Sequence, residues 1–255
     1  MKIATWNVNS IRVREPLVVD WLRTERPEVL CLQETKVVDD DFPSDELQRL
    51  GYAVAMSGQK TYNGVAIVSR LPMEDIAVGL EADPAPDDRR AIAATIDGVR
   101  VVCVYVPNGK SVESPSFDLK LRWLGALRET IQPRVASGED LVVCGDFNIA
   151  PDERDVHDPE QMRGQLHFHP DEHRALEQLC ALGLRDAFRI HRQEGELYSW
   201  WDYRGAAFRR NHGLRIDYLL VTDGMAGRCK EVVMDVEPRR APKPSDHIPV
   251  VAEFA

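Results

Sequence analysis

Carboxylate and amide side chains stand where several apolar runs of this sequence end. In the stretch "VVCGDFNI" (142–149), the apolar run breaks at Gly145 and leaves Asp146 and Asn148 two positions apart. Catalytic sites are usually built on loops and strand ends that a rigid scaffold holds in place. Other runs carry similar residues at their ends, namely Asn7, Asn9, Glu34, Tyr105, Asn108, Asp217, Asp246 and His247.

The repetition of these residues distinguishes them from ordinary turn residues. A single Asn or Asp at a strand end most often bonds to its own backbone, and a single His is more often structural than catalytic. Here the same residue types recur at several separate strand ends. The set is rich in oxygen and holds one His and no thiolate, which matches Mg²⁺ or Mn²⁺ better than a structural zinc. Such a cation commonly stabilises charge on phosphate, so the set predicts a phosphoryl hydrolase.

A second group of metal-ligating residue types lies in the stretch "HFHPDEH". It offers His167, His169 and His173, with Cys180 further along the chain. Zinc is the alternative that this group raises. However, His173 and Cys180 are seven positions apart on a helix with an ordinary core stripe. A solvated helix start is therefore the favoured interpretation.

Composition and charge limit the class of protein. With 255 residues, 44% hydrophobic and 29% charged, the chain is expected to form one globular domain, 1–255. A net charge of −10 argues against a protein that coats nucleic acid nonspecifically, because such binding relies on Lys and Arg. The five cysteines show no Cys-x-x-Cys spacing, and no signal peptide or membrane span is visible. We therefore expect a soluble cytoplasmic protein without disulfides or membrane contact.

The pattern of apolar residues predicts more strands than helices. Runs rich in Val and Ile, bounded by Gly, Pro, Asn or Asp, predict strands at 2–8, 28–33, 64–69, 99–106, 140–147, 215–222 and 247–254. Helical spacing predicts helices at 44–50, 117–131 and 171–182. The Pro-rich segment 81–90 is expected to be a surface loop. We expect sheets that are at least partly antiparallel, covered by helices.

An ordered set of motifs resembles one family. The segments "WNVNSIR", "LQETK", "GVAIVS", "YVPNG", "GDFNIAP", "WWDYR", "GLRIDYLL" and "PSDHIPV" follow the order seen in the exonuclease III family of abasic-site endonucleases. This family belongs to the wider endonuclease/exonuclease/phosphatase superfamily, and the match spans residues 2 to 253. The resemblance implies an α/β fold of the DNase I-like type. That fold is a four-layer α/β sandwich of two packed mixed β-sheets flanked by helices, with the active site where strand ends converge.

The resemblance also implies roles for the polar residues. Glu34 resembles the main metal ligand, with Asp246 and Asn7 close to the Mg²⁺ ion, for which Mn²⁺ can substitute. Asp146 matches the residue that orients or deprotonates the attacking water, and Asn148 matches a residue that holds a phosphate oxygen. Phe147, between them, is expected to turn to the core.

The remaining catalytic positions are carried over in the same way. His247 matches a donor to the phosphate or a general acid or base, and Asp217 matches the carboxylate that fixes the His tautomer. Tyr105 resembles the tyrosine near the scissile phosphate, and Asn108 resembles a neighbour that contacts the phosphate. Which of these groups is the general base stays open.

Substrate recognition follows from further matches. Trp200, Leu214 and Ile216 fall where the family builds an apolar pocket for a flipped-out abasic sugar, whereas Trp201 is expected to be a core residue. Four basic residues are expected to contact phosphate or order the site, with surface ion pairs as the alternative; they are Lys36, Arg90, Arg204 and Arg215.

The implied function is a Mg²⁺-dependent DNA repair phosphodiesterase that cleaves duplex DNA 5′ to abasic sites. Activity on 3′ ends, as a 3′-to-5′ exonuclease and in 3′-end cleaning, is expected as well, and the protein is expected to be a monomer. The segment 150–170 matches the family only through "DV-x-D-P", so the balance of these activities stays open. One alternative is a phosphatase or phospholipase of the same superfamily. Another is a non-catalytic nucleic-acid-binding regulator, disfavoured because uncompensated carboxylates repel phosphate unless a cation lies among them.

Overall fold

Two six-stranded sheets form the centre of the protein, whose computed structural model describes residues 1–255. The first sheet has the order β11-β12-β1-β2-β4-β3, with β1 (Lys2–Asn7), β2 (Val29–Gln33), β3 (Ala53–Ser57), β4 (Val65–Ser69), β11 (Cys229–Met234) and β12 (Val250–Phe254). The second has the order β5-β6-β7-β8-β10-β9, with β5 (Glu74–Val78), β6 (Ala91–Ile96), β7 (Val99–Tyr105), β8 (Leu141–Asp146), β9 (Leu184–Asp186) and β10 (Asp217–Thr222). Both sheets are mixed, because β1 pairs with β2, and β7 with β8, in parallel.

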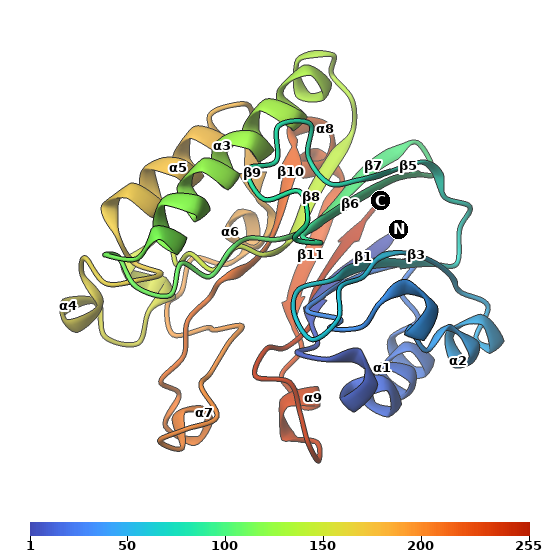
Figure 1. Ribbon diagram of the computed structural model, residues 1–255, viewed down its shortest axis with the longest axis horizontal. Helices are drawn as coiled ribbons and strands as arrows, with labels where there is room; N and C mark the ends of the chain where they lie inside the picture. The colour runs from blue at the N-terminus through green and yellow to red at the C-terminus, as the bar shows by residue number, and fades with distance from the viewer.

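Helices cover the outer faces of both sheets, which gives the four layers seen in Figure 1. Against the first sheet pack α1 (Ile11–Glu25) and α2 (Ser44–Arg49), and against the second pack α3 (Pro115–Ala136) and α5 (Pro170–Cys180). The shorter helices are α4 (Pro159–Met162), α6 (Ala187–His191), α7 (Ala207–Arg210), α8 (Asp223–Arg228), α9 (Glu237–Arg240), η1 (Asp39–Asp41) and η2 (Glu153–Asp155). None of the helices combines the length and the apolar character needed to cross a bilayer.

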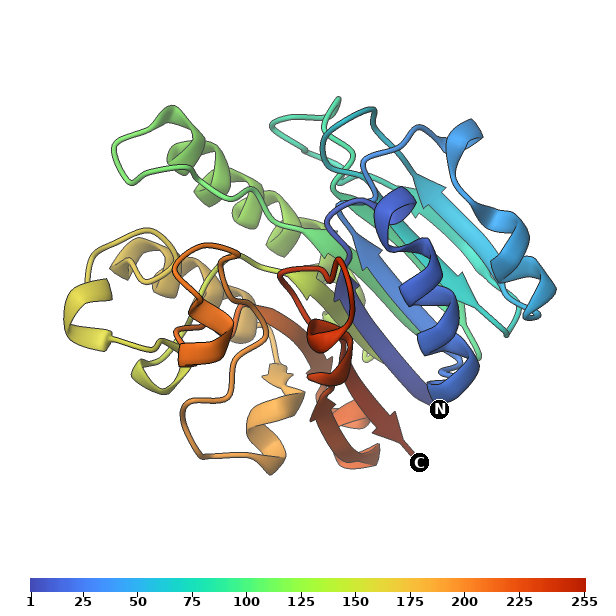
Figure 2. The ribbon, with the colours of Figure 1, turned by 90° about the horizontal axis from the view of Figure 1, so that it is seen from below.

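The central strands are buried on both faces, which explains their unbroken apolar sequences. On β7, Val101 and Cys103 face the core between the two sheets, whereas Val102 and Val104 face α3 and α5. A strand with two buried faces has no polar alternation, in contrast to a strand with one face in water. The two chain termini lie side by side on the first sheet (Figure 2), because β1 pairs with β12.

The predicted fold class is confirmed, and each of the seven predicted strands is present. The strands that the pattern missed are β3, β5, β9 and β11, all at sheet edges, and the Ala-rich β6. The segment 81–90 is a loop, as expected. Helix α3 extends beyond 117–131 at both ends, and α5 covers 170–180, so that 181 and 182 lie in a turn. The pattern also missed α1, in which Pro16 lies near the middle.

The register of the strands brings the polar strand ends to one edge of the sandwich. In the second sheet Tyr105 pairs with Asp146, and Asp146 pairs with Asp217. Because β10 runs antiparallel to β8, the first residue of β10 lies beside the last residue of β8. In the first sheet Asn7, the last residue of β1, pairs with Gln33, the last residue of β2. The ends of both sheets therefore face each other across the site.

Candidate active site

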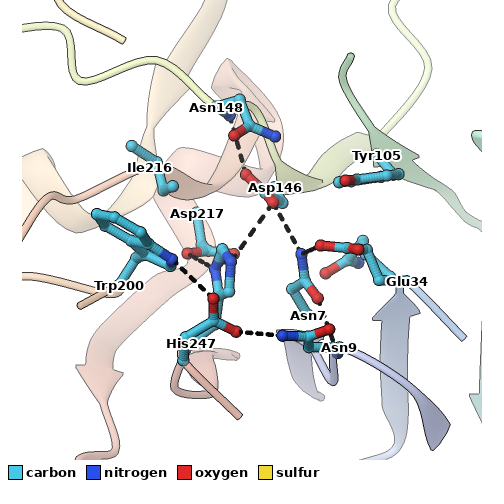
Figure 3. Close-up of polar contacts among 12 residues, drawn as sticks. Asn7, Asn9, Glu34, Tyr105, Asp146, Asn148, Trp200, Ile216, Asp217 and His247 are labelled. Atoms are coloured by element: carbon cyan, nitrogen blue, oxygen red, sulfur yellow. Dashed lines mark hydrogen bonds and ion pairs between the residues drawn. The ribbon is translucent and has the colours of Figure 1, made fainter. Parts of the chain in front are cut away.

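Three ionisable side chains converge at this edge. The side chains of Glu34, Asp146 and His247 lie close together (Figure 3), and their ligand atoms are all within 4.8 Å of one another. No other group of three His, Cys, Asp or Glu residues in the chain meets this condition. The Nδ2 atom of Asn7 lies 2.8 Å from Asp146 Oδ2 and 3.0 Å from Glu34 Oε1. Asn7 thus bridges two carboxylates at the ends of strands β2 and β8, which belong to different sheets.

Residues at the ends of β2 and β8 adopt unusual backbone conformations. Glu34 and Asn148 have φ angles of 51° and 54°, in the left-handed region that non-glycine residues rarely adopt. The N–H of Asn148 donates to Asp146 Oδ1 at 2.9 Å, which holds this turn. A Cβ at Gly145 would lie 1.8 Å from the carbonyl oxygen of Val104, so only glycine allows β7 and β8 to approach this closely. Phe147 packs in the core, as predicted.

His247 is oriented by a buried carboxylate. Its Nδ1 lies 2.9 Å from Asp217 Oδ2, and its Nε2 lies 3.7 Å from Asp146 Oδ2. Ser199 donates to Asp217 Oδ2 at 2.6 Å and accepts the backbone N–H of Asp217. Burial alone lowers the pKa of His247, but the charges of Asp217 and Asp146 outweigh burial and raise it to about 10. The imidazole is therefore a charged hydrogen-bond donor at neutral pH.

The two acidic residues Asp146 and Asp246 differ in their protonation. Burial raises the pKa of Asp146 to about 7, and the nearby Asp217 and Glu34 raise it further, against His247 and Asn7. Asp246 accepts hydrogen bonds from Asn9 Nδ2 and Trp200 Nε1, each at 3.0 Å. Although burial opposes the change, His247 and these donors lower the pKa of Asp246. Asp246 thus stays ionised where Asp146 still holds a proton.

Metal binding is expected to depend on pH through Asp146. Because its pKa is near 7 in the metal-free protein, a proton must leave before the carboxylate can meet a cation. The apparent affinity for Mn²⁺ should rise about tenfold per pH unit below pH 7 and level off above it. Isothermal titration calorimetry between pH 5.5 and 8.5 measures this dependence. A flat affinity over that range would contradict it, and the Asp146→Asn variant should bind weakly without the pH dependence.

Two basic residues predicted to contact phosphate or to order the site lie beside residues of the candidate site. Lys36 Nζ lies 2.8 Å from Glu34 Oε2 and 2.5 Å from Asn9 Oδ1. The guanidinium carbon of Arg90 lies 4.9 Å from the ring centroid of Tyr105. Burial, together with Glu34 and Asp146, holds the pKa of Tyr105 well above its usual value, so its hydroxyl is a neutral donor. Lys36 and Arg90 thus contact residues of the candidate site, and their contact with phosphate stays a prediction.

Arg215 and Arg204, by contrast, are engaged in ion pairs away from the centre. Arg215 is 1% exposed, and its guanidinium lies 2.6 Å from Asp155 and 2.7 Å from Asp186. Arg215 thus makes the ion pairs considered as the alternative, although they are buried and not on the surface. Arg204 is exposed and pairs with Asp202 at 2.7 Å, which is the surface ion pair considered as the alternative.

The apolar residues expected to form a pocket lie together. Trp200, Leu214 and Ile216 pack in one cluster with Ala150, Val156 and Phe168. Leu214 and Ile216 are each only 2% exposed, whereas Trp200 is half-buried and bonds to Asp246. Trp201 is buried in a separate cluster, as expected for a core residue.

The histidines of the His-rich stretch do not converge on one point, and each makes a hydrogen-bond contact of its own. His169 caps the first turn of α5, where its side chain accepts the N–H of Asp171. His167 Nδ1 lies 2.6 Å from the carbonyl oxygen of Asn148, and His173 Nε2 lies 2.9 Å from that of Ala150. These side chains hold the loop after β8.

Of three further residues that support the site, one was expected from the sequence and two were missed. Asn108 was expected, and its Nδ2 donates to Asn148 Oδ1 at 3.0 Å. Lys120 and Ser199 were not expected, although both are fully buried and bond to site residues. Neither has a signal in the sequence, because Lys120 lies in an ordinary helix and Ser199 in an ordinary polar-aromatic stretch.

Comparisons with known proteins agree with this geometry. The model of the Endonuclease/Exonuclease/phosphatase family matches residues 4–247. The chain belongs to this family. It is 32% identical to an exodeoxyribonuclease III of Haemophilus influenzae, with all of both chains covered. The predicted resemblance and the phosphodiester hydrolase class of this family member are thereby confirmed.

Two solved structures of family members share the fold over the full chain. One is the 3′ phosphatase NExo from Neisseria, solved as a D146N variant bound to a product DNA hairpin, with a TM-score of 0.98 and 47% identity. The other is an AP endonuclease from Archaeoglobus fulgidus, with a TM-score of 0.95 and 43% identity. Each comparison covers 100% of this chain and 99% of the other.

Proposed function

We propose that this protein is a Mg²⁺-dependent DNA repair nuclease that cleaves duplex DNA 5′ to abasic sites. It also removes blocking groups or nucleotides from 3′ ends. The observation that carries the proposal is the convergence of Glu34, Asp146 and His247, with Asp217 behind the histidine. The names of the relatives, an exodeoxyribonuclease III, a 3′ phosphatase and an AP endonuclease, support the same substrate class.

The donor set fits a hard divalent cation. Glu34 and Asp146 supply carboxylate oxygens, while His247 is directed at Asp217 and is better suited to donate than to ligate. Glu34 would hold the ion, with Asp146 close by. Asp246 would support the site through the hydrogen bond that it accepts from Asn9. Bound Mg²⁺, or Mn²⁺ in its place, would neutralise charge on the phosphate oxygens.

The side chains of this chain perform the remaining steps. Ionised Asp146, held by Asn7, orients or deprotonates the water that attacks phosphorus. His247 donates from Nε2 to a phosphate oxygen, while Asp217 fixes its ring. Asn148 and the neutral Tyr105 hydroxyl contribute further donors to the phosphate.

The Glu34→Ala variant should need more metal. Loss of a direct ligand is expected to raise the Mg²⁺ concentration for half-maximal cleavage by about 10- to 100-fold, because Asp146 would then be the one carboxylate left in the group of ligand atoms. A magnesium titration of DNA cleavage measures this value. Glu28→Ala is the matched control, since Glu28 precedes β2 and pairs with Arg70 at the far end of the strand. Unchanged activity at limiting Mg²⁺ would exclude Glu34 as a ligand.

The substrate assay separates the proposed activities. Three labelled duplexes are needed, one with an abasic-site analogue, one with a 3′-phosphate at a recess and one with a recessed 3′-hydroxyl. Each is tested with Mg²⁺ and with EDTA, and an inositol phosphate tests the phosphatase alternative. Cleavage at the lesion with Mg²⁺ supports the proposal, whereas no cleavage of any duplex by the folded protein would refute it.

A second candidate is an enzyme that processes 3′ ends without abasic incision. Leu214 and Ile216, which were expected to contact an abasic sugar, are buried. They therefore expose little apolar surface to such a sugar in this structure. The 47% identity to a 3′ phosphatase also favours this candidate. Activity on the two 3′-end substrates alone would select it. In both cases we propose a single domain, 1–255, acting as a monomer, which light scattering in solution would test.

A further inference from the structure

A fully buried ion pair lies directly behind the loop that carries Asn148. Lys120 of α3 and Glu172 of α5 are both 0% exposed, and the ammonium donates to the Glu172 carboxylate. Its other two bonds go to backbone carbonyls, those of Asn148 at 2.6 Å and Asn108 at 3.4 Å. A lysine has three protons to donate, so this side chain is fully satisfied.

The two carbonyls belong to the loops that follow β7 and β8. The side chains of these residues bond to each other, Asn108 Nδ2 to Asn148 Oδ1 at 3.0 Å. Asn148 is held in the left-handed region, with φ at 54°, and His167 Nδ1 lies 2.6 Å from the same carbonyl oxygen. The ammonium group of Lys120 therefore holds the backbone carbonyls of both Asn108 and Asn148.

Packing alone does not require a charge at this position. Replacing a buried ion pair with apolar residues of similar volume is often neutral or stabilising. Here the second Glu172 oxygen accepts the N–H of His169 at 3.1 Å, which anchors the pair to the first turn of α5. The bonds thus run from a rigid helix, through the lysine, to two residues of the candidate active site.

We propose that Lys120, with Glu172 as its counterion, is a positioning residue that sets the backbone of Asn148 and Asn108 for contact with the transferring phosphate. The inference rests on the proposed function, because it assigns Lys120 to the same reaction. Lys120 acts through the two asparagines and does not touch the substrate. Its removal should therefore reduce kcat and leave KM for DNA and the metal requirement nearly unchanged.

The test compares two variants. The variant with the larger loss of kcat should be the one with the smaller loss of melting temperature. Lys120→Met/Glu172→Gln removes the charges and the carbonyl contacts, and kcat should fall about 10- to 100-fold, as expected for misplaced contacts, with the melting temperature nearly retained. Glu172→Gln alone should lower the melting temperature more, yet reduce kcat less, because Lys120 still reaches both carbonyls. A role in stability alone would make kcat follow the melting temperature.

The Arg134→Met/Glu139→Gln variant is the control, since this ion pair lies at the other end of α3. It should leave kcat, KM and the metal requirement unchanged. A wild-type kcat in the Lys120 double variant, or a shift in its magnesium midpoint, would overturn the inference. If neither the Lys120→Met/Glu172→Gln variant nor the Lys120→Leu/Glu172→Leu variant folds, the ion pair is required for folding, and this result would also overturn the inference. If the wild-type protein cleaves no DNA, it is the proposed function that fails.

Discussion

Replacing Asp146 by asparagine is expected to reduce the turnover of DNA cleavage by about 10²- to 10⁴-fold, the range typical of a lost general base. An asparagine keeps the shape of the side chain but can neither accept a proton nor supply negative charge. Asparagine has a single acceptor oxygen, so it keeps only one of the two hydrogen bonds that Asp146 accepts, from Asn7 Nδ2 or from the Asn148 N–H, and the loss of the carboxylate charge should account for most of the effect.

Single-turnover cleavage of a labelled duplex, at saturating Mg²⁺, measures this effect. Asp140→Asn is the matched control, because Asp140 stands immediately before β8, at the opposite end from Asp146, and pairs with Arg228. The control should retain wild-type turnover and melting temperature. Turnover of the Asp146 variant within threefold of the wild-type value would remove Asp146 from the chemical step.

His247→Asn is expected to have the second largest effect, a loss of about 10²- to 10³-fold in turnover, because a charged donor to the transition state is removed. Asparagine cannot bond to Asp217 and to phosphate at once, and it carries no charge. Binding of uncleaved DNA should change far less, since ground-state contacts are spread over the loops.

Turnover and the dissociation constant for a DNA duplex, measured in Ca²⁺ to suppress cleavage, separate these effects. His191→Asn serves as the control, because His191 is exposed on α6 and is not among the site residues. An equal loss in binding and in turnover would assign His247 to DNA binding and not to the reaction.

Most of the strands that are buried on both faces were predictable from the sequence. Central strands such as β7 and β8 carry apolar runs of Val, Leu and Cys, which local pattern identifies directly. Edge strands such as β5 and β9 bury less and are short or polar, so their pattern carries little signal. Helix α1 was missed because its Pro16 argues against a helix, although tertiary packing of Trp21 and Leu22 holds it.

The identity of the candidate site residues was also accessible from sequence. Asp146, Asn148 and Asp217 stand at the ends of recognisable strands, and the ordered motifs assign them to a family. Motifs report residue types in order along the chain, so they indicate which side chains take part. They do not report what surrounds each side chain, so they gave no indication that Arg215 is held in buried ion pairs with Asp155 and Asp186.

Only the tertiary structure decided how these residues meet. Asn7 and Asp146 are 139 positions apart, and they touch because two sheets pack face to face. The same packing excludes water from Asp146 and raises its pKa to about 7, whereas Asp246 stays acidic beside its donors. The distances between these side chains, their burial and their pKa values depend on elements that are remote in sequence. The sequence by itself therefore determined which side chains are available, and the tertiary structure determined their protonation and their contacts.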